Sequence, residues 1–171
     1  MERSGGSAVP GTVALGRAPG GDVSKDDPAI RDAAKILARI VADDAAADEA
    51  RERYRIGPLP SLDADPGTAV QLEPGEHIVA IRESVFLDRR EPRPDLNALA
   101  GVAGTLYVTT RRLLLLGRIR LSIDLAEIED VAVSGERLLL VLRDARGVSL
   151  ETARPRLLRV ELAAARAALR T

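Results

Sequence analysis

Residues 104–128 have the sequence GTLYVTTRRLLLLGRIRLSIDLAEI, and this stretch decides the fold. Apolar and polar residues alternate from Arg118 to Leu125, which is the period of a half-buried β-strand. Two further apolar runs, Leu106–Thr109 and Leu113–Leu116, are separated by a short polar connection. The stretch therefore predicts three consecutive antiparallel strands joined by tight turns.

Strand patterns continue on both sides of this stretch. On the N-terminal side, Glu83 breaks the apolar alternation within residues 77–88, which predicts a bent strand. On the C-terminal side, Arg137–Arg143 (RLLLVLR) is a short apolar run that the turn Asp144–Gly147 connects to Val148–Thr152. The chain is therefore expected to form seven strands, at residues 77–88, 105–109, 112–117, 118–124, 128–133, 137–143 and 148–152.

Helical patterns flank the strands. Between Pro155 and Arg170, apolar residues fall on one side of a helix, at Leu158, Leu162, Ala165 and Leu169. We expect this helix to cover the open end of the sheet, where the core would otherwise meet water. The predicted fold is α+β by content but mainly β: a seven-stranded antiparallel barrel or sandwich with a C-terminal helical cap and a preceding amphipathic helix.

The N-terminal part divides into three segments before the strand domain at 76–171. Residues 1–26 are rich in Gly, Ser, Ala and Pro and are predicted to be a flexible tail. Residues 27–56 predict an amphipathic helix with one apolar stripe in its first half, formed by Ile30, Ala33, Ala34, Leu37, Ile40 and Val41. Its alanine-rich second half is expected to be solvated, with a shallow contact face. Residues 57–75 predict an extended, proline-rich linker that Leu59 and Leu62 can pin to a surface.

Composition excludes several classes of function. The 171 residues include 25 basic and 26 acidic side chains, so the chain is not a polycation for nucleic acid. It has no cysteine, one histidine and 2% aromatic residues, so no nucleophile, base and orienting group can be assembled. We therefore expect no enzymatic activity, no metal, no cofactor, no nucleic-acid partner and no small-molecule substrate. The sequence has neither a run of about 18 apolar residues nor a convincing secretory signal, so a cytoplasmic location is expected.

Three short motifs carry a resemblance to a known family. Leu72, Gly75 and Glu76 match an L-x-x-G-E entry to the first strand. Residues 104–113 match G-x-L-Y-x-T-x-x-R-L, and residues 123–128 match I-x-L-x-x-I. In this order, and with the final helix, the chain resembles GRAM and bacterial PH-like domains of the pleckstrin-homology superfold over about residues 70–170. The resemblance implies a non-catalytic module that binds lipid headgroups, peptides or a partner domain.

Two functions follow as hypotheses. The preferred one is a cytoplasmic adaptor module that engages a protein partner or a second copy of itself, through a helix face formed by Ile30, Ala34, Leu37 and Val41. This face can dock in cis on the strand domain or in trans on a partner, and we favour trans. The alternative is a peripheral membrane module that binds anionic lipid headgroups weakly, through Arg89, Arg90, Arg93, Arg111 and Arg112.

Overall fold

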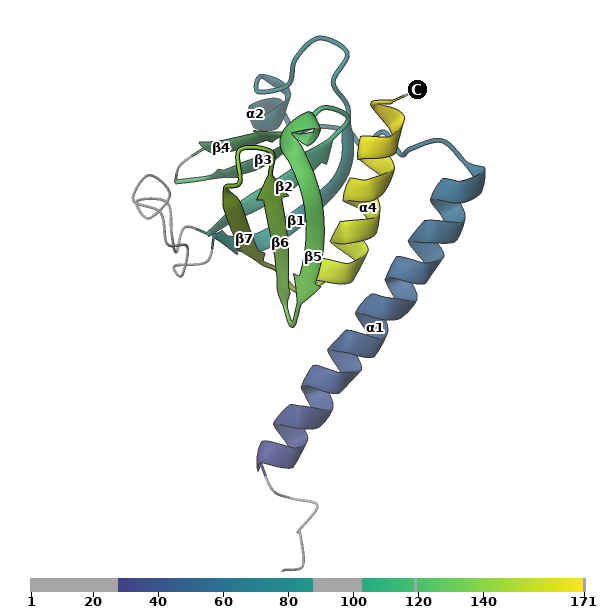
Figure 1. Ribbon diagram of the computed structural model, residues 1–171, viewed down its shortest axis with the longest axis vertical. Coiled ribbons are helices and arrows are strands. Elements are labelled where there is room, and N and C mark those ends of the chain that lie inside the picture. Colours follow the sequence, from purple (N-terminus) through teal and green to yellow (C-terminus); the bar gives the residue numbers. More distant parts are fainter. Residues whose placement is uncertain (1–27, 88–102, 119, 171) are drawn as a thin grey trace, which may run out of the picture.

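A computed structural model describes residues 28–87, 103–118 and 120–170 (Figure 1). About 39% of it is helical and 37% is strand, which confirms the predicted α+β content. The predicted tail at 1–26 lies outside the described residues. The helices are α1 (Pro28–Ile56), α2 (Pro66–Ala69), the 3₁₀ turn η1 (Leu125–Glu127) and α4 (Pro155–Ala168). The strands are β1 (Ile78–Leu87), β2 (Ala103–Thr109), β3 (Arg112–Gly117), β4 (Arg120–Asp124), β5 (Ile128–Ser134), β6 (Arg137–Leu142) and β7 (Gly147–Glu151).

The seven strands form one antiparallel sheet in the order β4-β3-β2-β1-β7-β6-β5. Because β4 and β5 are its two edges, the predicted barrel or sandwich is an open, curved sheet (Figure 1). The predicted bend in the first strand is confirmed: the β1–β2 register shifts between Arg82 and Val85, and Ser84 has a φ of 53°. Beyond this bulge, β1 leaves the first half of the sheet and pairs with β7 through Phe86 and Leu87.

Helix α4 covers the concave side of the sheet and completes the main core (Figure 1). Leu158, Leu162 and Ala165 are fully buried there, as the helical spacing predicts. Leu169 does not join them and is 45% exposed, because α4 ends at Ala168. The helix therefore buries about two turns of its apolar stripe and leaves the last position in solvent.

Two glycines let β2 and β3 approach closely. Gly104 and Gly117 are paired across the two strands. A Cβ atom on Gly104 would lie 2.6 Å from the Leu116 carbonyl oxygen, and one on Gly117 would lie 2.5 Å from the Ala103 carbonyl oxygen. Gly104 is therefore required by the close approach of a neighbouring backbone.

The linker begins beside α4, where Leu59 packs against the main core, and from Leu62 onward it lies on the outer side of the sheet. Leu62 donates its backbone N–H to the Ile78 carbonyl at 2.8 Å, but its side chain is 41% exposed, so the backbone and not the predicted leucine side chain attaches the segment there. Ala64 and Leu72 pack on a second apolar cluster formed by Ile78, Tyr107 and Leu114. The segment is not extended throughout, because Asp65 caps the short helix α2 through the Thr68 N–H at 3.0 Å.

Candidate functional site

The second half of α1 docks on α4 and thereby fixes the position of the whole N-terminal helix. Ala47 and Ala50 are 1% and 3% exposed and pack with Val160 of α4. Tyr54 and Leu157 flank this contact. Most other side chains of this half are exposed, so the prediction of a solvated half with a shallow contact face is confirmed. Alanine has no bulk beyond Cβ, so it allows two helices to approach closely and buries little surface in doing so.

Asp43 is the anchor of this contact. It is 1% exposed, and its two carboxylate oxygens accept the backbone N–H groups of Arg156 at 2.8 Å and Leu157 at 3.0 Å. These groups belong to the first turn of α4, whose own N-cap residue, Arg154, makes no side-chain cap. Asp43 therefore caps a helix that is remote in sequence and places a negative charge at the positive end of its dipole.

This anchor leaves the first half of α1 projecting beyond α4. The contacts advance in the same direction along both helices, and α4 begins beside Asp43. Residues 28–42 therefore extend past the start of α4, as Figure 1 shows. At about 1.5 Å per residue this projection is about 22 Å long. Arg39 makes an exposed contact of 3.5 Å with Glu136 in the β5–β6 turn.

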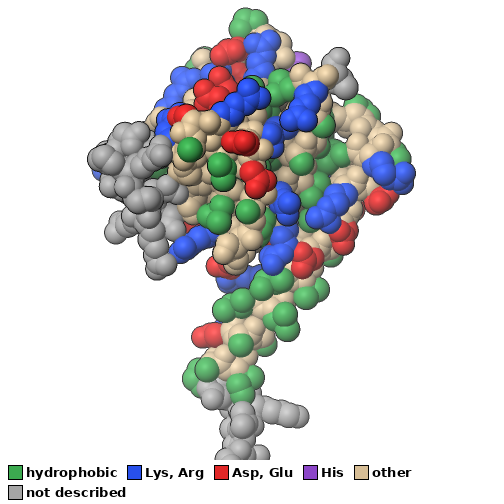
Figure 2. Space-filling view, viewed as in Figure 1, with side chains coloured by type: hydrophobic (Ala, Val, Ile, Leu, Met, Phe, Trp, Pro, Cys, Tyr) green, Lys and Arg blue, Asp and Glu red, His purple; other side chains and the backbone are tan. Residues whose placement is uncertain are grey.

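The predicted partner face lies on this projection. Leu37 and Val41 are 61% and 60% exposed, Ile30 is 40% exposed, and Ala34 is exposed too. At about 100° per residue, Val41 and Asp43 lie about 160° apart around the helix. The face formed by Ile30, Ala34, Leu37 and Val41 therefore points away from α4. In Figure 2 hydrophobic side chains are visible along this projecting part of the helix.

The projection also carries charge beside its apolar face. Its basic side chains are Arg31, Lys35 and Arg39, and Asp32 is its acidic one. Lys35 and Asp32 form an exposed ion pair at 3.1 Å. The second half of α1 docks in cis on α4, whereas the predicted partner face lies on the first half and stays exposed.

The predicted anion-binding arginines do not form one described cluster. Arg89, Arg90 and Arg93 lie outside the described residues. Arg111 is half exposed and pairs with Glu73 at 3.1 Å. Arg112 is 8% exposed. An anion site made of all these arginines stays a prediction, and the surroundings of Arg111 and Arg112 do not favour it.

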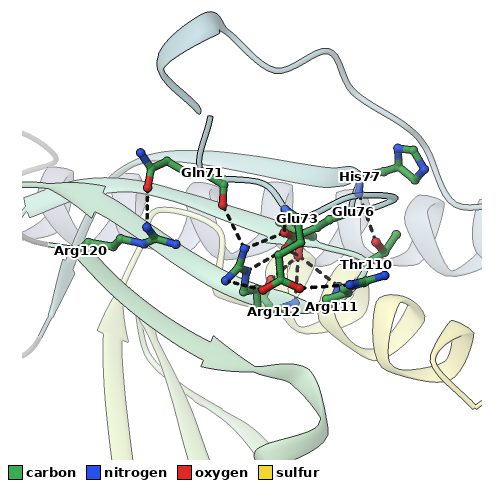
Figure 3. Close-up of polar contacts among 9 residues, drawn as sticks. Gln71, Glu73, Glu76, His77, Thr110, Arg111, Arg112 and Arg120 are labelled. Carbon is green, nitrogen blue, oxygen red and sulfur yellow. Dashed lines mark hydrogen bonds and ion pairs between the residues drawn. The ribbon is translucent and has the colours of Figure 1, made fainter. Parts of the chain in front are cut away.

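Arg112 is held by a buried carboxylate, as Figure 3 shows. Its Nε and Nη2 atoms donate to the two oxygens of Glu76 at 3.0 and 2.8 Å, a bidentate pair. The Glu76 side chain is completely buried and also accepts from the Thr109 hydroxyl at 2.6 Å. Arg112 further donates to the Gln71 carbonyl at 3.0 Å. The pair therefore joins the linker to the β2–β3 hairpin.

The electrostatics of Glu76 match this structural arrangement. Burial alone raises the pKa of the carboxyl, but hydrogen bonds from Arg112 and Thr109 and the charge of Arg112 outweigh it, so the pKa lies below its usual range. Glu76 is therefore ionised at neutral pH and neutralises Arg112, leaving little positive charge there to attract an external anion.

A second buried ion pair lies under the α1–α4 contact. Arg82 of β1 pairs with Glu161 of α4, whose side chain is 8% exposed. Burial raises the pKa of Glu161, and the charge of Arg82 opposes this rise. Burial and the nearby charge of Glu161 also raise the pKa of Tyr54. Tyr54 is thus neutral at physiological pH, with its ring against the α1–α4 contact.

Comparisons with known proteins give no family. No known protein family matches the sequence, and no curated protein does. Among the solved structures that match the chain is the C-terminal domain of an unknown protein from Leishmania infantum, at 16% identity and a TM-score of 0.43. The match covers 54% of this chain and 86% of that one. Within the part of the chain that the structure describes, no helix is long and apolar enough to cross a bilayer.

Proposed function

We propose that this chain is a non-catalytic PH-like binding module of the GRAM type, which engages a protein partner through the projecting half of α1. The seven antiparallel strands and the helix that covers them support the PH-like assignment. The observation that carries the function is the exposure of Leu37 and Val41 on a helix whose other half is anchored. Such side chains on a rigid helix are suited to pairing with a second amphipathic helix.

A second copy of the chain fits this face. In an antiparallel pairing centred between residues 35 and 36, Ile30 opposes Val41 of the second copy and Ala34 opposes Leu37 of the second copy. Each large side chain thus meets a smaller one, as in helix packing generally. Lys35 and Arg39 lie on the other side of the helix, so this pairing does not bring them face to face. Because the face spans only about 12 residues, it buries less than the ~1,600 Å² of a standard interface, and a weak dimer is expected.

Sedimentation velocity over a broad concentration series tests this proposal. The full chain is expected to dimerise reversibly, and Leu37→Asp should abolish the dimer without lowering thermal stability, because Leu37 is 61% exposed. Ile56→Asp is the matched control, since Ile56 is even more exposed at 79% but lies at the opposite end of α1. A chain that stays monomeric at all concentrations would overturn the second copy as partner. Binding to anionic vesicles that Leu37→Asp abolishes would replace the protein partner with a membrane.

A further inference from the structure

A groove lies between the C-terminal half of α1 and α4, away from the exposed partner face. The helices are close at Ala47 and Ala50 and separate towards their C-terminal ends (Figure 1). The segment Gly57–Leu59 borders the space that this leaves. The groove has a volume of about 820 Å³. Sites for small molecules have volumes of about 300–1,000 Å³, so the groove has the size of a ligand site.

The walls of the groove are apolar and small. Val160, Ala163, Ala164 and Ala167 of α4 line one side, and Tyr54 and Leu59 line the other. Ala163 and Ala167 are exposed, so their methyl groups face water in the absence of a ligand. The lining is wide enough to accept a chain of methylene groups, whose burial is favourable in proportion to its apolar area.

The charged residues at the groove are all basic. Arg51, Arg55 and Arg159 line it, and no acidic residue is among its described lining residues. Within the described part of the chain, Arg159 has no ion-pair partner. Arg51 and Arg55 pair with Asp48 and Glu52 along α1, and all four of these side chains are more than half exposed. Exposed pairs of this kind are weak, so these arginines can exchange their partners for another anion.

We propose that this groove binds a single-chain anionic amphiphile of the fatty-acid type. The acyl chain lies along the alanine side of α4, and the carboxylate is held by the arginines. An apolar lining beside a cationic rim fits a ligand with both an alkyl chain and one negative charge. A nucleotide or polyphosphate would leave the alanine surface uncovered, and a neutral lipid would leave the arginines without a counter-charge. The ligand is bound and not transformed.

Calorimetry with dodecanoate, below its micelle concentration, tests the proposal on the full chain. We expect one saturable site, and dodecanol should bind at least about tenfold more weakly because it cannot make a charge-assisted hydrogen bond. Arg159→Gln should weaken dodecanoate binding by a similar factor, whereas Arg170→Gln, two residues beyond the end of α4 and outside the groove lining, should not. The absence of binding, or equal binding of dodecanol, would overturn the proposal.

A groove-filling substitution provides a second test. Ala167→Leu should abolish dodecanoate binding by occupying the space of the acyl chain, and Ala163→Leu should act in the same way. Both residues are exposed and leucine favours helices, so the unliganded melting temperature should stay close to that of the wild type. Ala45→Leu is the matched control, because Ala45 is an exposed alanine of α1 outside the lining. If Ala167→Leu binds dodecanoate as the wild type does, the site lies elsewhere.

Tyrosine fluorescence locates the ligand independently. The chain has two tyrosines and no tryptophan. Tyr54 lines the groove, whereas Tyr107 is buried on the outer side of the sheet. Dodecanoate should change the emission of the wild type, and Tyr54→Phe should remove that change while calorimetry still detects binding. If anionic vesicles produce the same signal in Ala167→Leu as in the wild type, the chain is adsorbing to a surface and the groove proposal fails.

Discussion

Replacement of Asp43 by alanine tests whether one side chain holds α1 on the rest of the molecule. The carboxylate accepts two backbone N–H groups of α4, at 2.8 and 3.0 Å, from a position that is 1% exposed. A hydrogen bond to a charged group contributes about 1.5–3 kcal/mol, and loss of an N-cap costs about 0.5–2 kcal/mol. Water can solvate the freed N–H groups once the helices separate. We therefore expect Asp43→Ala to lower the free energy of unfolding by about 2–3 kcal/mol.

Urea denaturation followed by circular dichroism measures this loss, and Asp44→Ala is its control. Asp44 also contacts the start of α4, through the side chain of Arg156 at 2.9 Å, but it is 57% exposed. An exposed pair of this kind contributes at most about 1 kcal/mol. If the two variants lose equal stability, or if Asp43→Ala unfolds like the wild type, the cap does not anchor the helix and the argument for a rigid projection fails.

Four further substitutions probe the sheet and its polar contacts. Gly104→Ala should lower the melting temperature strongly, because its Cβ would lie 2.6 Å from the Leu116 carbonyl oxygen; thermal unfolding as in the wild type would contradict the close approach of the strands. Glu76→Gln should cost about 3 kcal/mol in urea at neutral pH, because it removes the buried counter-charge of Arg112 and leaves only the half-exposed Glu73, at 3.2 Å. The Glu76 pKa is lowered from 4.5, so its stabilisation is present above that pH and is lost on acidification through the folded-state pKa; a variant as acid-sensitive as the wild type would refute this. Leu140→Ala should cost about 2–5 kcal/mol in urea, and Leu121→Ala should cost clearly less because Leu121 is only partly buried.

Local sequence patterns predict the strands because alternation and turn residues act over a few positions. The predicted 112–117 strand coincides with β3, and the other ends differ by at most two residues. Burial is harder to predict than register. Leu121 has the predicted phase, yet it is only partly buried because β4 is an edge strand. Ile119, which belongs to the same predicted strand, lies outside the described residues.

Contacts between distant residues account for what the sequence does not predict. Asp43 and Arg156 are 113 positions apart, and no local pattern indicates that an aspartate in one helix caps another. Alanine occurs both on solvated helices and at close helix contacts, so the sequence predicts a shallow contact face in this half of α1 but not that it docks on α4. Glu76 and Arg112 both belong to the family-like motifs, but only the fold brings them within 2.8 Å. Helical spacing predicts the apolar stripe that contains Leu37 and Val41, but its exposure depends on where α4 begins, which no local pattern indicates.

Asp43 anchors α1 near the middle of the helix, so the parts of α1 before and after it can move only together. A molecule that binds near Leu37 would be held at a fixed distance and angle from the sheet, because a continuous helix does not bend as a linker does. Both parts belong to one continuous helix, so widening the space between Tyr54 and α4 would tilt the N-terminal part of α1 in the opposite direction. A displacement of a few ångströms at the C-terminal end of α1 would be transmitted to its N-terminal end with similar size, because the two parts have similar lengths. The geometry of any assembly built on this module is thus determined where Asp43 meets α4.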